Sequence, residues 1–168
     1  MRAIPFAFIV SLLAAMAGFA KPAAPAAPPD VRITVKAVTA GTDHKGKTTV
    51  SSRRLQIQLE NREHRDLKGL QLEWKIVGED IQNHRKSITA KGNRTVNLDA
   101  DGNLDIESDV ARFSKTEGGV KTIGRGKNRR RVGQPDTGHR YAGYVAELKQ
   151  GGKVIAEAST NGIQKQLK

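Results

Sequence analysis

The chain has 168 residues, of which 29 are lysine or arginine and 17 are aspartate or glutamate, so its formal net charge is +12. It contains no cysteine, which excludes disulfide bonds, a cysteine nucleophile, a lipid-modified cysteine and thiolate metal sites. The length is sufficient for one domain held by its hydrophobic core alone, and the positive charge favours anionic partners.

Residues 1–20 have the composition of a secretory signal peptide. Arg2 supplies the positive start, an apolar run follows, and small residues offer cleavage after Ala17 or Ala20. The alternative is a retained membrane anchor, because the apolar run is just long enough to span a bilayer. Residues 21–30 hold four of the six prolines and predict an extended Pro/Ala-rich linker. We therefore expect a protein secreted across the inner membrane, located in the periplasm or at the cell surface.

Alternating apolar and polar residues predict β-strands after the linker, and no segment shows convincing helical periodicity. The clearest strand covers residues 70–76, where every second residue is apolar and the only tryptophan, Trp74, lies on the apolar face. We expect this strand to be central, with the indole between two sheets. Similar patterns occupy residues 31–38 and 54–60, and residues 39–52 between them are expected to form a loop.

The C-terminal half gives a second strong strand signal. A hairpin is expected at residues 140–160, because two consecutive glycines separate two alternating runs. Within 140–148 the pattern does not reveal which set of side chains faces inward. Residues 87–90 and 95–98 predict a weak hairpin, and residues 164–168 a polar tail.

The acidic segment 98–110 allows two interpretations. Oxygen ligands alternate at Asp99, Asp101, Asn103 and Asp105. This spacing is a weak calcium candidate, because the glycine and the bidentate acid of an EF-hand loop are missing. The alternative is an Asp-Gly turn followed by a strand with an acidic outer face. The outward acids are then Asp105, Glu107 and Asp109.

The most basic stretch is residues 121–131, inside an irregular segment, 114–137, that we expect to be a loop. Six of its eleven residues are basic: Lys121, Arg125, Lys127, Arg129, Arg130 and Arg131. Runs of this kind either stay solvated or make electrostatic contacts. No aromatic residue is interleaved with the cations, so nucleic acid is not the expected partner. These six residues are the candidates for binding an anionic partner.

The strand pattern predicts an all-β fold, an immunoglobulin-like antiparallel β-sandwich of about seven strands over residues 31–163. A different β-sandwich or a small open barrel would give a similar pattern. Tyr141 is a candidate for the corner tyrosine of such domains, although its spacing is one residue off.

With its leader, linker and sandwich, and with the segments LEWKIVG (72–78) and RYAGYVAEL (140–148), the chain resembles a family of small secreted immunoglobulin-like envelope proteins. That family is associated with type IV pilus genes in mucin-dwelling Verrucomicrobia, and its sandwich resembles archaeal pilin domains. The resemblance implies a role in pilus formation or surface attachment.

No catalytic motif accompanies these features. The four histidines are scattered, and no serine stands in a nucleophile elbow. We therefore predict a protein that is not an enzyme and has no cofactor. The expected function is a non-catalytic envelope module for pilus-type assembly, surface attachment or protein–protein interaction. The expected partners are envelope or pilus proteins, or another copy whose acids Asp105, Glu107 and Asp109 meet the basic run. The alternative is a binder of anionic glycan or lipopolysaccharide through residues 121–131.

Overall fold

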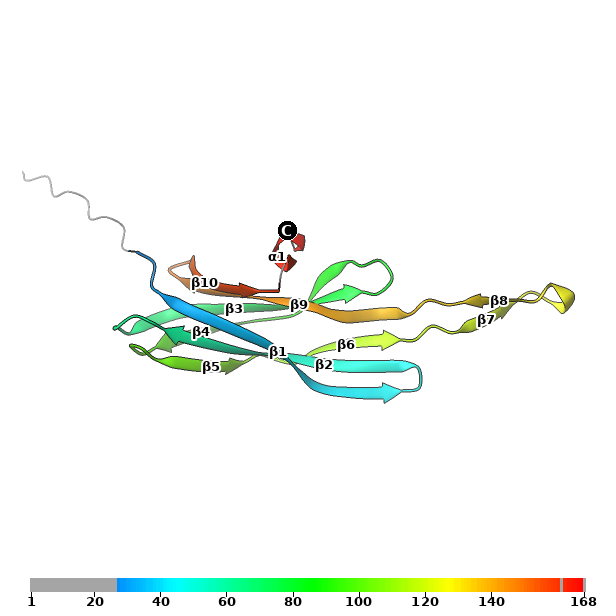
Figure 1. The fold of residues 1–168 in the computed structure, drawn as a ribbon, viewed down its shortest axis with the longest axis horizontal. Helices are drawn as coiled ribbons and strands as arrows, with labels where there is room; N and C mark the ends of the chain where they lie inside the picture. The colour runs from blue at the N-terminus through cyan, green and yellow to red at the C-terminus, as the bar shows by residue number, and fades with distance from the viewer. Residues whose placement is uncertain (1–26, 161, 168) are drawn as a thin grey trace, which may run out of the picture.

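The computed structural model describes residues 27–160 and 162–167, and most of these residues form β-strands (Figure 1). The predicted signal peptide and residues 21–26 of the predicted linker lie outside the described residues. The elements are β1 (Val31–Lys45), β2 (Thr48–Asn61), β3 (Leu67–Asp80), β4 (Lys86–Leu98), β5 (Asn103–Glu107), β6 (Ala111–Thr116), β7 (Val120–Ile123), η1 (Gly126–Asn128), β8 (Arg130–Gly133), β9 (Thr137–Gln150), β10 (Lys153–Ser159) and α1 (Ile163–Gln166).

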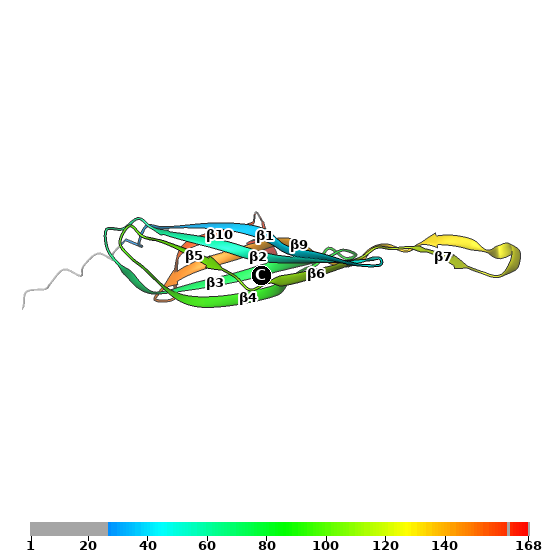
Figure 2. The ribbon, with the colours of Figure 1, turned by 90° about the horizontal axis from the view of Figure 1, so that it is seen from below.

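Two antiparallel sheets pack face to face (Figures 1 and 2). In the first sheet, β2 pairs with β1 on one side and with β5 and β6, one after the other, on the other side. In the second sheet the order is β4-β3-β9-β10. Since β5 and β6 share one position, the sandwich has seven strand positions. The prediction of an all-β antiparallel sandwich of about seven strands is confirmed.

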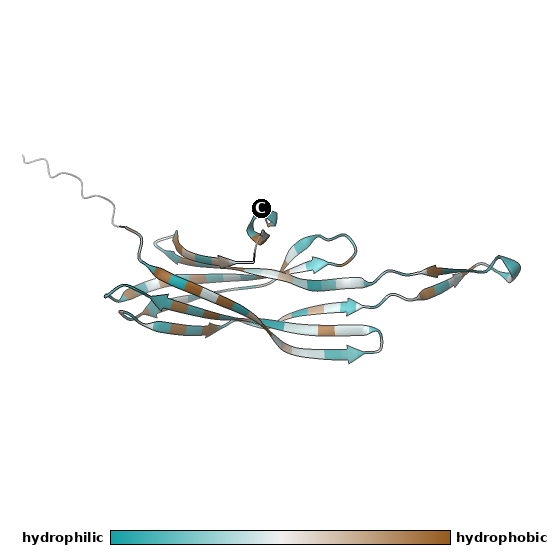
Figure 3. Cartoon of the chain, viewed as in Figure 1, coloured by the Kyte–Doolittle hydropathy of each residue, from teal (hydrophilic) through white to brown (hydrophobic). Residues whose placement is uncertain are grey.

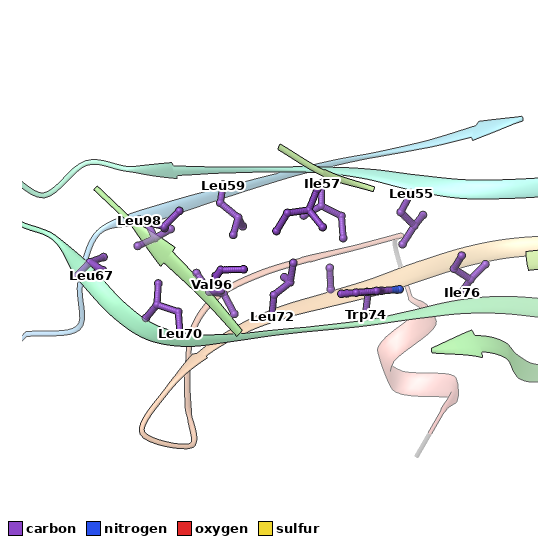
Figure 4. Close-up of a cluster of buried hydrophobic side chains, with 14 of the residues drawn as sticks. Leu55, Ile57, Leu59, Leu67, Leu70, Leu72, Trp74, Ile76, Val96 and Leu98 are labelled. Atoms are coloured by element: carbon purple, nitrogen blue, oxygen red, sulfur yellow. The ribbon is translucent and has the colours of Figure 1, made fainter. Parts of the chain in front are cut away.

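The core lies between the sheets and is built from the alternating residues that the sequence analysis identified. Trp74 is 7% exposed and lies on β3, which is flanked by β4 and β9, so its predicted central position is confirmed. Figure 4 shows the indole among side chains from facing strands. The other labelled residues of this buried cluster are Leu55, Ile57, Leu59, Leu67, Leu70, Leu72, Ile76, Val96 and Leu98. Burial of these apolar side chains is the main force that holds the two sheets together.

A glycine on the neighbouring strand makes room for the indole. Gly92 of β4 pairs with Trp74 of β3. A Cβ atom added at Gly92 would lie 2.3 Å from Cζ2 of Trp74, closer than two carbon atoms can approach. The ring can therefore lie flat over β4 only because residue 92 has no side chain.

Both faces of β9 are covered, which explains why its inward side could not be predicted. Ala146 and Leu148 are fully buried in the main core, whereas Val145 points to the opposite face and is only 4% exposed. There Val145 packs in a second small cluster with Val77 and Ile163, the first residue of α1. Residues 164–166 of the expected polar tail therefore belong to α1, whose first residue packs on the outer face of the second sheet.

Several strands are longer than the sequence pattern indicated. Residues 39–52 were expected to form a loop, but β1 and β2 continue through them with only a two-residue turn. The weak hairpin expected at residues 87–98 is instead one continuous strand, β4. In both places the strands extend beyond the segment of alternating apolar and polar residues, because backbone pairing with a neighbouring strand does not require apolar side chains.

The tyrosine that anchors a strand through its hydroxyl is Tyr144, not the candidate Tyr141. The Tyr144 hydroxyl donates to the backbone carbonyl of Val35 at 3.2 Å and thereby joins β9 to β1 in the facing sheet. Tyr141 packs edge-on against Phe113, with ring centroids 5.9 Å apart. Burial of its ring raises the pKa of the Tyr141 hydroxyl.

Candidate functional site

A two-stranded arm projects from one end of the sandwich (Figures 1 and 2). We define the arm as residues 120–133: β7 and β8 pair antiparallel, and η1 lies at the tip. The expectation of a loop was wrong for these strands. The β-branched residues Val120, Ile123 and Val132 favour extended backbone on both sides of a turn rich in glycine and polar residues.

The arm leaves the sandwich at a seam between the two sheets. β6 of the first sheet pairs with β9 of the second through Lys115 with Gly138 and Thr116 with Thr137. The arm is inserted directly between β6 and β9 in the chain, so both of its ends start from this seam. The arm is therefore attached to both sheets at once.

Asp136 fixes the base of the arm. Its Oδ1 accepts a hydrogen bond from the Gly118 amide at 2.9 Å, and its Oδ2 lies 2.8 Å from the Lys115 ammonium. The Gly118 amide, followed by Lys115, lowers the pKa of the Asp136 carboxyl, and the same carboxylate raises the pKa of Lys115. A backbone bond from the Gln134 amide to the Gly119 carbonyl, at 2.6 Å, closes the base.

The arm carries all six predicted anion-binding residues and no acidic residue. These cations are Lys121, Arg125, Lys127, Arg129, Arg130 and Arg131. All six are exposed, and within residues 27–160 and 162–167 none of them forms an ion pair. Six positive charges on fourteen residues, out of a net +12 for the whole chain, make the arm a concentrated cationic surface.

Apolar side chains are exposed on the arm beside the cations. Val120 is 66% exposed, Ile123 43% and Val132 38%. Figure 3 shows hydrophobic segments on both strands of the arm and a hydrophilic tip. The charge of this stretch was predicted but its exposed apolar residues were not, although the β-branched residues that flank the basic run are a sequence signal for them.

The predicted acidic residues lie on the sandwich, not at the arm. Asp105 and Glu107 are exposed on β5, an edge strand that pairs only with β2, and Asp109 follows β5. Figure 1 places β5 toward the end of the sandwich opposite the arm. Glu107 is already paired with Arg54 at 2.7 Å, whereas Asp105 forms no ion pair with the part of the chain that the structure describes. The two predicted charged regions are therefore separate in one molecule.

A hollow of about 370 Å³ lies on the outer face of the first sheet, beside β5. Its polar lining comes from three adjacent strands: Thr34, Lys36, Gln56, Gln58, Asp105 and Glu107. The two glutamines project from β2 between β1 and β5. Their amides can accept and donate hydrogen bonds, but the lining contains no aromatic platform and no paired nucleophile and base.

The calcium candidate does not assemble as a ligand set. Among the described residues no three His, Cys, Asp or Glu side chains are grouped so that they could hold a metal ion. Asp101 Oδ2 instead lies 2.8 Å from Nδ1 of His64, and this hydrogen bond raises the pKa of the imidazole. The Asp99 carbonyl accepts from the Gly102 amide at 3.0 Å, which is the alternative Asp-Gly turn, and Asn103 and Asp105 belong to β5.

One charged cluster was not visible in the sequence. At the turn between β3 and β4, Glu79 Oε1 lies 2.8 Å from both Nδ1 of His84 and a guanidinium nitrogen of Arg140. These two partners, His84 first, lower the pKa of the Glu79 carboxyl. The cluster joins β9 to the β3–β4 turn, and it forms only because strand pairing brings together residues that are 61 positions apart in the chain.

Comparisons with known proteins add no functional assignment. No family model and no curated protein matches the chain. Among the solved structures to which the chain is similar is the X-ray structure of Northeast Structural Genomics Consortium target SoR45, with 15% identity over 79% of this chain and 89% of that one and a TM-score of 0.39. At this identity and TM-score, the similarity supports no conclusion about the fold or function of the chain. In the part of the chain that the structure describes, no helix has the length and apolar character needed to cross a bilayer.

Proposed function

We propose that this protein is a non-catalytic secreted module of the cell envelope that attaches to an anionic partner through its arm. One observation carries the proposal: a ribbon that projects from the sandwich bears six exposed cations and no acidic residue of its own. A basic residue that serves only solubility needs no such placement. The leader supports export, and the resemblance to pilus-associated envelope proteins supports a role in assembly or surface attachment.

The geometry makes the charge of the arm effective at a distance. About seven extended residues separate its base from its tip, which corresponds to roughly 20 Å. The screening length at physiological ionic strength is about 8 Å, so acids on the sandwich do little to cancel the field at the tip. Two acids flank the base: Asp136 is paired with Lys115, and Glu117 is exposed but lies at the far end of the arm from the tip. The tip therefore presents nearly its full charge to a partner.

Arginine predominates on the arm and indicates the chemistry of the partner. Four of the six cations are arginine. The planar guanidinium binds two oxygens of a phosphate, sulfate or carboxylate group at once. Envelope polymers that display such groups, anionic glycan and lipopolysaccharide, are the proposed ligands.

Retention on a sulfated glycan column tests this function. The variant carries Lys127→Ser, Arg129→Ser, Arg130→Ser and Arg131→Ser. A matched control removes four exposed cations from the sandwich instead: Lys36→Ser, Lys91→Ser, Arg94→Ser and Lys153→Ser. We expect the arm variant to elute at low salt and the control to elute close to the unaltered protein. Equal loss from both variants would show that net charge, and not the arm, causes retention.

Self-assembly is a second candidate, favoured by the position of Asp105. This carboxylate has no ion pair among the described residues and lies away from the arm, so the arm of a second molecule could reach it. A contact between two different patches is heterologous and leads to rings or filaments. Sedimentation velocity at low and high salt tests it, and a monomer under every condition would dispose of this candidate.

A further inference from the structure

The two faces of the arm differ in composition. Residues directly opposite each other in an antiparallel pair share a face, and successive residues alternate between faces. The register pairs Lys121 with Val132 and Ile123 with Arg130, so these four side chains share one face. We call this the mixed face of the arm. The opposite face carries Val120, Thr122, Arg131 and Gly133.

The mixed face combines two aliphatic side chains with two cations. Ile123 and Val132 are diagonal neighbours across the ribbon, and the two cations occupy the other diagonal. Both aliphatic side chains are about two-fifths exposed, and no described part of the chain packs over them. The same arrangement, apolar groups with lysine or arginine, binds amphipathic helices to anionic lipid surfaces.

A lipid surface fits this face better than a soluble polyanion does. A soluble glycan offers anionic oxygens for Lys121 and Arg130, but little apolar surface for Ile123 and Val132. At a lipid surface, phosphate groups lie next to the boundary of the acyl chains, so cations and aliphatic side chains find partners at one depth. Each cation near an anionic lipid surface and each buried aliphatic group then adds to the same attachment.

The backbone of the arm limits how deep it can enter. A two-stranded ribbon has two open edges, whose unpaired amide and carbonyl groups cannot be placed in hydrocarbon. The arm can therefore rest at the level of the headgroups but cannot span the bilayer. An isolated two-stranded hairpin is also only marginally stable in water, so a surface that covers its apolar side chains would stabilise it.

We propose that the mixed face of the arm docks on a phosphate-bearing lipid surface, with Lys121 and Arg130 on the phosphates and Ile123 and Val132 at the acyl-chain boundary. This inference rests on the proposed function, because it names the partner of the same cationic arm. The cations at the tip, Arg125, Lys127 and Arg129, extend the contact to neighbouring headgroups.

Vesicle sedimentation tests the proposal with the protein purified after export. The probes are phosphatidylcholine vesicles with and without phosphatidylglycerol, and the variant is Ile123→Thr with Val132→Thr. Threonine keeps the β-branched shape and the charge of the arm while it removes apolar surface. The matched control, Val120→Thr, makes the same change on the opposite face. We expect the double variant to bind anionic vesicles about tenfold more weakly and the control to bind like the unaltered protein.

Retention on the sulfated glycan column separates the two proposals. We expect both threonine variants to be retained like the unaltered protein, because their cations are intact. Undiminished vesicle binding by the double variant would overturn the lipid inference and leave the proposed function standing. Retention on duplex DNA without binding to anionic vesicles would also overturn it. If the unaltered protein binds neither vesicles nor glycan, the proposed function itself fails.

Discussion

The sandwich and the arm use the same element, the antiparallel strand pair, under opposite conditions. In the sandwich, side chains such as Leu72 and Ile76 are completely buried. In the arm, every side chain whose exposure is described is exposed, and cations outnumber aliphatic residues. Burial therefore holds the sandwich, whereas backbone pairing and the anchored base hold the arm. This difference implies that stability and attachment can be altered separately, and four experiments examine it.

The largest expected effect is the loss of the indole from the sandwich. Trp74→Ala should reduce the free energy of unfolding by about 3–5 kcal/mol, because it leaves a cavity between the sheets. Urea unfolding followed by far-UV circular dichroism measures it, since the variant loses the only tryptophan fluorophore. Glycan retention should stay unchanged below the transition. An unchanged urea midpoint would contradict the central role of this residue.

A smaller loss is expected when a methyl group is forced against the indole. Gly92→Ala must displace the ring of Trp74 and should cost about 1–3 kcal/mol. Gly133→Ala on the arm is the matched control, since a Cβ there has no neighbour within 4 Å. Chemical denaturation of both variants compares the same substitution in the two regions. Equal losses would show that packing matters as much on the arm as in the sandwich.

The base of the arm should loosen at low pH. The pKa of Asp136 is held below its ordinary value of 3.8. The contribution of the ionised carboxylate to the stability of the arm base is therefore complete above pH 3.8, and it is lost as the pH falls through the lower pKa of the folded state. We expect the protection of the Gly118 amide against hydrogen exchange to fall in that window. Asp136→Asn keeps an acceptor for this amide and should remove the pH dependence. The Gly102 amide, bonded to a backbone carbonyl, is the internal reference.

The smallest effect on stability is expected from the arm itself. The four serine substitutions at residues 127 and 129–131 should change the free energy of unfolding by no more than about 0.5 kcal/mol, since these side chains are exposed and unpaired with any described residue. Thermal unfolding of this variant beside the unaltered protein measures the change. A destabilisation comparable to that of Gly92→Ala would mean that the arm supports the fold. That result would contradict the separation of stability from attachment.

The sequence predicted the sandwich because hydrophobic alternation is a local signal. The apolar face of β3 and the central place of Trp74 follow directly from residues 70–76. The hairpin of β9 and β10 was also predicted from its two glycines. The inward face of β9 could not be predicted, because both of its faces are covered. Ile163 covers the outer face, and it belongs to a helix that is too short to show a periodic pattern in the sequence.

The charge of the sequence identified the candidate site, but it did not predict that the site is a two-stranded ribbon. Residues 121–131 are basic in any conformation, so the sequence alone is sufficient to single them out as a candidate anion-binding stretch. The paired ribbon was not predicted, because its strands β7 and β8 have only four residues each. Consecutive arginines also interrupt the alternation of apolar and polar residues. The separation of Asp105 from the arm depends on the sheet order, which links residues far apart in the sequence.

The seam at the base of the arm also determines how the molecule would bear mechanical load. The chain enters the sandwich at β1 near one end, and the arm leaves at the other end (Figure 1). A pull between an attached tip and the N-terminal side therefore runs along the strands. Ladder hydrogen bonds lie across the strands, so such a pull shears many of them together instead of opening them one by one. Through the pairing of β6 with β9, the force is divided between both sheets.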